Sequence, residues 1–252
     1  MNIAVITGAS SGLGKEYVSA VAQTRKDLDE IWIIARRRER LEELHQKYGD
    51  KIRVFPADLA EEDSMEYIRK QFVEKDATVR LLINNAGFGR LGDFDQMNPE
   101  DDRGMVRLNC EALTVLTSVC LPFMKENGEI INTCSIAAFA PNARMAVYCS
   151  TKSYVMSFSR CLRYELKKRK INVLAVCPGP MDTEFLPVAG IEKGSSKTFD
   201  RLPRVEPSGI ARRSLAASKK KRGVYTDRFF YKFYRFVAKI LPHSLVMKMS
   251  AA

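Results

Sequence analysis

Short apolar segments alternate with amphipathic segments along most of this chain, and this alternation restricts the fold more than any other feature. Within the apolar segments polar residues do not alternate with apolar ones, as is typical of strands buried on both faces. Strands that alternate with helices predict a parallel, doubly wound α/β sheet of about seven strands with helices on both faces. The expected strands are 3–6, 31–35, 52–55, 81–83, 129–134, 171–176 and 223–226.

Composition and charge limit the class of protein. The 252-residue chain carries a net charge of +11, which suits nucleic acid, an anionic membrane or a phosphorylated ligand, and equally an ordinary basic cytosolic protein. Its six cysteines have no Cys-x-x-Cys spacing and only His45 and His243 to join them, so we expect reduced thiols and no metal site. The chain starts without a signal-peptide pattern, and no apolar run approaches the length of a membrane span. These features indicate a cytoplasmic protein.

The segment Thr7–Gly14 joins the first expected strand to a helical pattern at 15–26. Its three glycines are Gly8, Gly12 and Gly14. Glycine lets a backbone approach a pyrophosphate closely, and the helix N-terminus that follows offers free amide groups. The segment does not match a P-loop, because Glu16 stands where that motif requires Ser or Thr. We therefore expect a dinucleotide site here, the alternative being a merely tight turn.

The second expected strand ends at Ala35 and is followed by Arg36, Arg37 and Arg38. A dinucleotide fold that prefers NAD places an acidic residue near this point, whereas an arginine accommodates the 2′-phosphate of NADP. Planar guanidinium groups pair well with phosphate. The pattern favours NADP(H); the alternative is a solvated basic helix start, which the helix dipole disfavours.

Three further polar positions follow expected strands or interrupt an apolar helix. Asp58 follows the third strand and suits the adenine amino group, or alternatively caps the next helix. The small, amide-bearing segment Asn84–Gly87 follows the fourth strand, where a backbone can lie against a ligand. Asn109 lies among apolar neighbours in a helix expected over 99–125 and needs a hydrogen-bond partner, either in a site or within the core.

Ser135 ends the strand 129–134, and Tyr148 and Lys152 lie four residues apart in a helix expected over 145–169. Residues at this spacing share one helix face. An ammonium beside a phenol favours the phenolate, so we expect Lys152 to lower the pKa of Tyr148 from about 10. A tyrosine tuned in this way can transfer a proton at neutral pH. Alone, the pair is also compatible with a solvated lysine beside a half-buried tyrosine.

Together these residues resemble the short-chain dehydrogenases/reductases over residues 2–226. The motifs that carry the resemblance are Thr7–Gly14, Asp58, Asn84–Gly87, Asn109, Ser135, Tyr148-x-x-x-Lys152 and Pro178-Gly179 with Thr183. No catalytic position departs from the family pattern. The resemblance implies a Rossmann-type fold over 1–227, an NAD(P)(H)-dependent oxidoreductase acting on a carbonyl/alcohol pair, and a homodimer or homotetramer. Ala35 and Arg36 look like the NADP(H)-preferring branch.

The resemblance also implies a role for each residue. Tyr148 is the proton donor, Ser135 hydrogen-bonds the substrate oxygen, Lys152 holds nicotinamide ribose hydroxyls, and Asn109 positions a water that links Lys152 to solvent. Residues 183–205 form the substrate loop, whose polar segment 190–197 we expect to be mobile. The implied cofactor-binding residues are Gly8, Ser10, Ser11, Gly12, Leu13, Gly14, Arg36, Arg37, Asp58, Leu59, Asn85, Ala86, Gly87, Tyr148, Lys152, Pro178, Gly179 and Thr183.

The tail, residues 228–252, differs from the rest of the chain. It predicts a basic amphipathic helix, with Lys232, Arg235 and Lys239 opposite an apolar face. That face consists of Phe229, Phe233, Phe236, Val237 and Ile240. Three interpretations stay open: a cap over the substrate pocket, a subunit contact, or a peripheral membrane contact helped by the basic run 219–222. An aromatic lid would suit an apolar substrate.

The sequence therefore predicts an NADP(H)-dependent reductase of an apolar carbonyl compound, such as a steroid or a 3-oxoacyl or fatty-acyl compound. One alternative is a sensor that binds NADP(H) without turnover, although the Ser/Tyr/Lys set is intact. Another is a protein whose basic tail binds a membrane or nucleic acid. We expect the partner to be a small molecule rather than nucleic acid.

Overall fold

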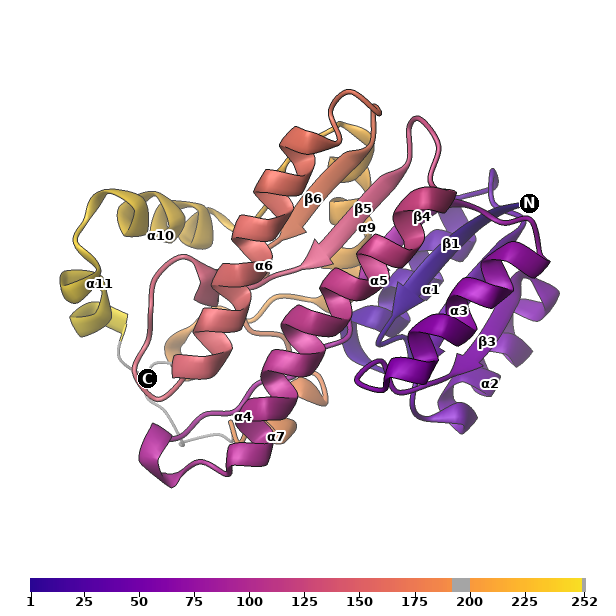
Figure 1. Cartoon of the computed structure of the whole chain (residues 1–252). Helices are drawn as coiled ribbons and strands as arrows, with labels where there is room; N and C mark the ends of the chain where they lie inside the picture. The colour runs from indigo at the N-terminus through magenta and orange to yellow at the C-terminus, as the bar shows by residue number, and fades with distance from the viewer. Residues whose placement is uncertain (192–199, 251–252) are drawn as a thin grey trace.

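A seven-stranded parallel sheet forms the centre of the molecule, in the order β3-β2-β1-β4-β5-β6-β7 (Figure 1). The computed structural model describes residues 1–191 and 200–250. Every pair of neighbouring strands is parallel, which confirms the predicted doubly wound sheet. The strands are β1 (Asn2–Thr7), β2 (Glu30–Ala35), β3 (Ile52–Pro56), β4 (Thr78–Asn84), β5 (Glu129–Thr133), β6 (Asn172–Val176) and β7 (Val224–Tyr225).

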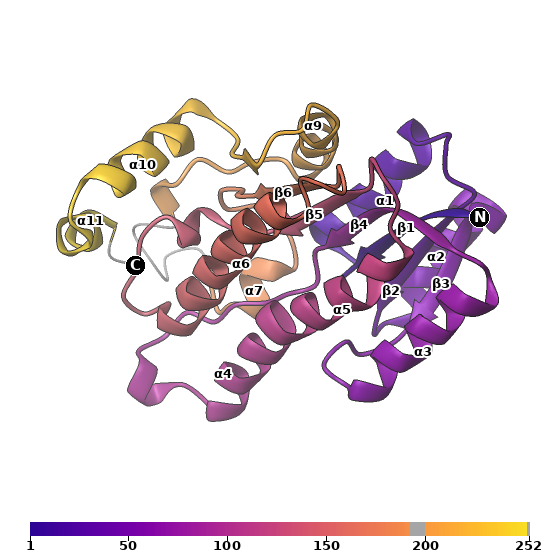
Figure 2. The same cartoon turned by 45° about the horizontal axis from the view of Figure 1, so that its top comes forward.

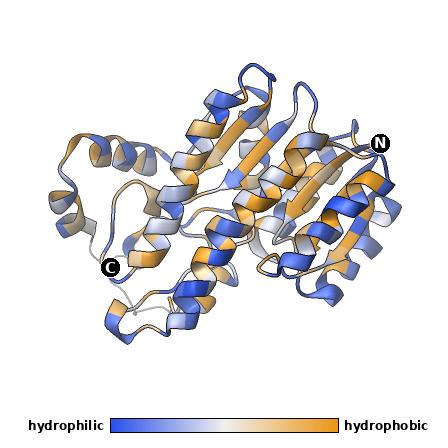
Figure 3. Ribbon diagram, in the orientation of Figure 1, coloured by the Kyte–Doolittle hydropathy of each residue, from blue (hydrophilic) through white to orange (hydrophobic). Residues whose placement is uncertain are grey.

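Helices cover both faces of the sheet and complete the three layers (Figure 2). Apolar side chains of α1, α2 and α9 form one core layer with one face of the strands, and those of α3, α5 and α6 form another with the opposite face. Figure 3 shows hydrophobic colour concentrated on the strands between these layers. The helices in these layers are α1 (Gly12–Thr24), α2 (Arg38–Tyr48), α3 (Glu62–Glu74), α5 (Leu113–Cys120), α6 (Ala146–Glu165) and α9 (Pro207–Lys219).

The strand order reverses at β1, which pairs with β2 on one side and with β4 on the other. The connections after β1 and β4 leave the sheet in different directions, so a crevice opens between them at the carboxyl ends of the strands. Ligands of open α/β sheets bind at this kind of position. The topology therefore brings the glycine-rich loop, Asp58, Asn85 and Ser135 to one edge.

The helix expected over 99–125 is not regular. It consists of α4 (Pro99–Val106), a π-helical turn (Arg107–Ala112) and α5, followed by a 3-10 turn at Leu121–Phe123. Such single π-helical turns are often found at functional sites, and this one contains Asn109. The whole stretch Pro99–Phe123 is long and apolar enough, by length and composition alone, to span a membrane.

That finding corrects the expectation that no apolar run approaches membrane-spanning length. Burial explains part of this composition, because Leu116 and Cys120 of α5 are almost inaccessible in the core layer and 39% of the apolar window is buried. A core helix of a soluble protein passes the same test of length and composition.

The C-terminal part contains more helix than expected. The loop 183–205 carries the short helix α7 (Phe185–Val188), and α10 (Phe229–Ile240) is followed by α11 (His243–Ser250). Of the segment 190–197 expected to be mobile, residues 192–197 lie outside the described residues. Ala140, Ala238 and Val246 form a small apolar cluster that joins α10 and α11 to the segment after β5.

Candidate active site

A cavity of about 850 Å³ lies over the carboxyl ends of the strands. Its walls include both the glycine-rich loop and residues of α10, so one continuous space joins the expected cofactor cleft to the C-terminal helices. All of the site residues expected from the sequence line it except Gly14 and Asn109. These two contact residues of the wall, Gly14 next to Gly8 and Asn109 through a hydrogen bond with Phe88. Among residues 1–191 and 200–250, no cluster of His, Cys, Asp or Glu suits a metal ion.

The glycine-rich loop is shaped by close backbone contacts. Gly8 and Gly12 have positive φ angles of 64° and 49°, which favour glycine. A Cβ added to Gly14 would lie 2.0 Å from the Gly8 carbonyl oxygen, so helix α1 can approach the loop only with glycine there. Thr7 Oγ1 accepts hydrogen bonds of 2.9 Å from the backbone amides of Asn85 and Ala86, which fixes this loop against the one after β4. The resulting cradle fits the pyrophosphate of a dinucleotide.

Basic side chains border the cavity beyond the end of β2. The Arg36 side chain is 75% exposed, and its Nη1 lies 3.7 Å from Asp58 Oδ2. Arg37 is committed elsewhere: its Nη1 lies 2.8 Å from Glu184 Oε2, and its Nη2 donates to Ser10 Oγ at 3.1 Å. The hydrogen bond from Arg37 lowers the pKa of Glu184.

The carboxylate of Asp58 lines the cavity and also makes two contacts within the protein. Its Oδ1 accepts a hydrogen bond of 3.0 Å from the backbone amide of Ala60, which is a local turn contact. The capping alternative is wrong, because the N-cap residue of α3 is Glu61 and its side chain makes no capping hydrogen bond. Because Oδ2 is the oxygen that faces Arg36, the carboxylate both orders the backbone after β3 and helps to fix the basic edge of the cleft.

Ser135, Tyr148 and Lys152 meet where β5 and α6 adjoin the cavity. The Tyr148 and Ser135 side chains are hydrogen-bonded to each other. Ser135 Oγ also accepts from the Ala137 amide at 3.1 Å, which holds the hydroxyl at the end of the strand. Lys152 Nζ donates to the Thr133 carbonyl oxygen at 2.9 Å and lies 5.7 Å from the centre of the Tyr148 ring. The tyrosine and the lysine are both buried, so the solvated-lysine alternative is wrong.

The structure corrects the expected pKa of Tyr148. Burial raises the pKa of Tyr148 above its ordinary value, and the hydrogen bond with Ser135 opposes the rise only in part. Lys152 directs its ammonium group to the Thr133 carbonyl, and burial lowers the pKa of Lys152 itself. In this arrangement the phenol therefore keeps its proton at neutral pH.

Asn109 is fully engaged within the protein. Its Nδ2 donates to the Phe88 carbonyl oxygen at 2.8 Å and to Thr151 Oγ1 at 3.1 Å, and its Oδ1 accepts from the Phe88 amide at 3.1 Å. A Cβ added to Gly87 would lie 2.7 Å from Asn109 Oδ1 and 3.6 Å from Lys152 Nζ. Asn109 thus fixes the backbone after β4 beside the lysine.

Several residues that the sequence did not single out also shape the site. The Phe185 ring lies 5.7 Å from the Tyr148 ring, centre to centre, and a Cβ at Gly89 would lie 2.7 Å from Tyr148 Cδ2. Tyr231 of α10 is completely buried, and its Cε2 lies 2.3 Å from where a Cβ of Gly179 would stand. In the sequence, only Gly179 of the Pro178-Gly179 pair indicates close packing at this point. It does not reveal that the side chain packed there is Tyr231.

Comparisons with known proteins agree with this geometry. The sequence model of the family described as short chain dehydrogenase matches residues 2–191. The chain belongs to that family. It is 32% identical over 222 residues to a fatty acyl-CoA reductase of Acinetobacter baylyi, covering 83% of this chain and 70% of the relative.

Two further relatives cover most of the chain. An NADP-dependent 3-hydroxy acid dehydrogenase of Schizosaccharomyces pombe is 30% identical over 229 residues, covering 87% of this chain and 88% of the relative. A solved short-chain dehydrogenase of Sphingobium yanoikuyae in complex with NADPH is 26% identical, with a TM-score of 0.78 and coverage of 96% and 97% of the two chains. Membership of this oxidoreductase family and these relatives support a nicotinamide cofactor in the crevice.

Proposed function

We propose that this short-chain dehydrogenase is an NADP(H)-dependent reductase that interconverts an apolar carbonyl compound and its secondary alcohol. The observation that carries the proposal is the neutral, buried Tyr148 hydrogen-bonded to Ser135 in a cavity continuous with the glycine-rich loop. A proton donor, a hydroxyl for the substrate oxygen and a dinucleotide cradle in one space are what carbonyl reduction requires.

Tyr148, Ser135 and Lys152 have different roles in the proposed reduction. A nicotinamide cofactor held at the glycine-rich loop would supply a hydride to the carbonyl carbon, and the carbonyl π electrons would move to the oxygen. Tyr148 Oη donates its proton to that oxygen, which completes the alcohol and leaves a phenolate. Ser135 Oγ donates a hydrogen bond to the same oxygen as its negative charge develops. The positive charge of Lys152 stabilises the phenolate until it regains a proton.

The preference for NADP(H) is supported by the end of β2. Ala35 offers no carboxylate for an adenosine ribose, and the exposed guanidinium of Arg36 is available to a 2′-phosphate at the cavity wall. The word NADP in the name of the S. pombe relative points the same way. We assign the 2′-phosphate to Arg36 first, with Arg37 as a second donor once it leaves Glu184.

An apolar substrate is supported by the wall beyond Tyr148. Aliphatic and aromatic side chains from four parts of the chain enclose that end of the cavity, so a polar substrate would lose hydrogen bonds to water there. The name of the A. baylyi relative, a fatty acyl-CoA reductase, fits a long acyl chain. The enclosing residues include Ala140, Met145, Phe185, Leu186, Ile191, Leu202, Phe230, Phe233, Tyr234, Val237 and Val246.

The experiment that tests the proposal measures NADPH oxidation with ketosteroids, 3-oxoacyl thioesters, long-chain aldehydes and small polar ketones. We expect turnover with one apolar class and weak activity with the polar ketones, each repeated with NADH. Tight NADPH binding with no turnover on any compound would instead support the sensor alternative. A preference for the small polar ketones would contradict the apolar assignment.

Several expectations from the sequence stay predictions beside this proposal. They are the homodimer or homotetramer, the cytoplasmic location, the division at residue 227, and the water held by Asn109. The roles of Pro178, Gly179 and Thr183 at the nicotinamide are proposals of the same kind, supported by the position of all three in the cavity wall.

A further inference from the structure

Helix α10 presents different side chains in four directions, because successive residues of a helix are turned by about 100°. Tyr231 and Ala238 point into the protein and are buried. Phe230, Tyr234 and Val237, next to them around the axis, line the cavity. Lys232, Arg235 and Lys239 lie on the other flank. The remaining direction, called here the apolar side of α10, consists of Phe229, Phe233, Phe236 and Ile240.

The apolar side of α10 faces away from the protein. Phe229 is 82% exposed, Phe236 61% and Ile240 62%, so these side chains are not the ones that cap the cavity. The sequence predicts one apolar face on this helix, either as a cap over the cavity or as an external contact. In the structure, one side of the helix lines the cavity and another side faces outward. Scattered single apolar residues are normal on a surface, whereas four on one helix side form a patch that marks an interaction site.

Charge decides which partner suits this patch. The segment Phe229–Ile240 contains no acidic residue, and exposed Lys232 and Lys239 border the apolar side. A twofold contact through this side of the helix would bring the lysines of both copies of α10 into one interface, on chains that each carry +11. An aromatic patch beside lysines instead matches the acyl region and the anionic head groups of a bilayer.

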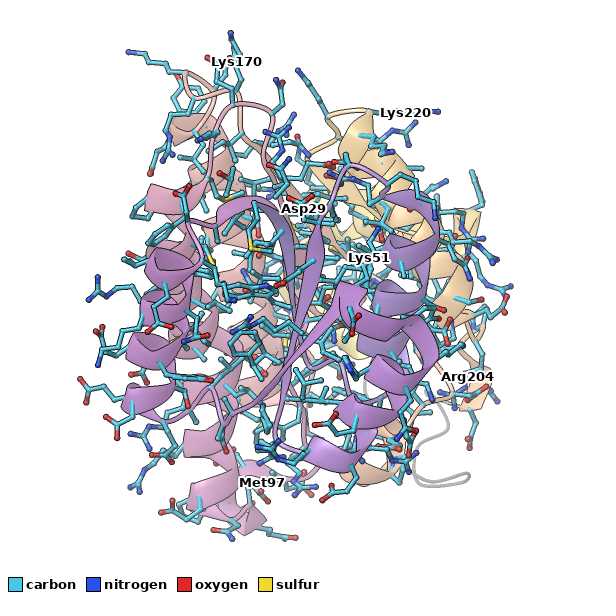
Figure 4. The ribbon with its side chains drawn as sticks, turned by 90° about the vertical axis from the view of Figure 1, so that its right-hand side faces the viewer. Asp29, Lys51, Met97, Lys170, Arg204 and Lys220 are labelled. Carbon is cyan, nitrogen blue, oxygen red and sulfur yellow. The ribbon has the colours of Figure 1, made fainter. Side chains whose placement is uncertain are left out.

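The basic run 219–222 does not belong to this surface. It precedes β7, whereas α10 follows the end of β7. Figure 4 shows Lys220 and Lys170 at the end of the molecule opposite Met97 and Arg204, and the Arg228 side chain before α10 donates to the Arg204 carbonyl oxygen. The run 219–222 therefore adds no cations to the patch, and it supplies a matched control.

The patch also adjoins the cavity. Phe233 is 56% exposed and at the same time lines the cavity, so the wall of the cavity continues into the outer surface at this helix. We propose that the apolar side of α10 docks the protein on an anionic lipid bilayer, with Lys232 and Lys239 at the head groups. In that position the cavity would admit an apolar substrate directly from the bilayer. Only this consequence rests on the proposed function, whereas the docking itself does not.

The test is co-sedimentation of the full chain with vesicles, independent of any activity. The vesicles are phosphatidylcholine alone or with about a third phosphatidylglycerol, at low and high salt. We expect the wild type to bind the anionic vesicles, more weakly at high salt. The variant Phe229→Ser/Phe236→Ser/Ile240→Ser, which leaves the cavity wall untouched, should bind about a hundredfold more weakly or worse.

Matched controls separate the patch from general surface effects. Tyr164, Val73 and Phe94 are 82%, 61% and 65% exposed, so replacing these three by Ser removes similar exposed apolar groups elsewhere and should leave binding unchanged. Lys232→Glu/Lys239→Glu should weaken anionic binding about thirtyfold or more. Lys219→Glu/Lys220→Glu makes the same change in net charge and should weaken it much less.

Three results would overturn the proposal. The wild type could remain in the supernatant with every vesicle, or the control variants could lose binding as fully as the α10 variants. The third is an oligomer, measured by analytical ultracentrifugation, that dissociates in the α10 variants while the wild type ignores vesicles; the patch would then be a subunit contact. Turnover of a water-soluble carbonyl compound, measured in parallel, separates these outcomes from failure of the reductase assignment.

Discussion

Replacing Arg36 by alanine should separate the two nicotinamide cofactors. The Arg36 side chain is 75% exposed and its ion pair with Asp58 spans 3.7 Å. Exposed pairs of this kind contribute at most about 1 kcal/mol to stability, so we expect the Arg36→Ala protein to fold normally. Any large change in cofactor affinity then reports binding rather than damage to the fold.

The magnitude follows from the lost contact. A charge-assisted hydrogen bond contributes about 1.5–3 kcal/mol. Each 1.4 kcal/mol is tenfold in a dissociation constant. We therefore expect Arg36→Ala to raise the Kd of NADPH about tenfold to a hundredfold. NADH has no 2′-phosphate, so its Kd should change little.

Arg37 provides an internal comparison. Its guanidinium already pairs with Glu184 and donates to Ser10, so binding a 2′-phosphate must first break those contacts. Arg37→Ala should therefore weaken NADPH less than Arg36→Ala does. Glu184→Gln releases Arg37 and should tighten NADPH, by up to about fivefold for an exposed pair.

Fluorescence titration of NADPH and NADH measures all of these constants on one protein preparation. Arg38→Ala is the matched control, since Arg38 is 65% exposed, pairs with Glu42 and does not line the cavity. An equal rise in the Kd of NADH and NADPH for Arg36→Ala would refute the assignment of the 2′-phosphate to Arg36.

Three further predictions concern the loop, the tail and the tyrosine. Gly14→Ala should abolish measurable NADPH binding, because its Cβ would lie 2.0 Å from the Gly8 carbonyl oxygen; retained binding in a fluorescence titration would contradict this. Tyr231→Leu should lower the free energy of unfolding in urea by about 2–4 kcal/mol, since it loses a buried ring and a 2.6 Å hydrogen bond to the Pro203 carbonyl oxygen. Because burial raises the pKa of Tyr148, its phenol should stay protonated as pH rises past about 10, its ordinary value. An ultraviolet difference titration against Tyr148→Phe checks this, and phenolate appearing at lower pH would count against it.

The sheet and most of the crevice could be predicted because they depend on local patterns. Apolar segments such as 129–134 and the glycines of Thr7–Gly14 restrict the backbone by themselves, and parallel topology then brings strand ends to one edge. Spacing alone also placed Tyr148 and Lys152 on one face of a helix. These features require no knowledge of distant contacts.

The features that were missed depend on packing between distant segments. The pKa of Tyr148 follows from how completely the surrounding chain buries it, and the Lys152 ammonium turns to the Thr133 carbonyl, which no spacing encodes. The contact of Tyr231 with Gly179 joins segments about fifty residues apart. The tail pattern predicted an amphipathic helix correctly, but the side that packs inward could not be read from periodicity, because α10 has two apolar directions.

The measurement that tests the central claim most directly is the rate of NADPH-dependent reduction by Tyr148→Phe, on a substrate that the wild type turns over. Removing the only hydroxyl of this side chain leaves its ring in place, so the Kd of NADPH should change little. The loss of proton donation should lower kcat about a hundredfold to ten-thousandfold. If Tyr148→Phe retains most of the wild-type kcat, Tyr148 is not the proton donor and the account of the site is wrong.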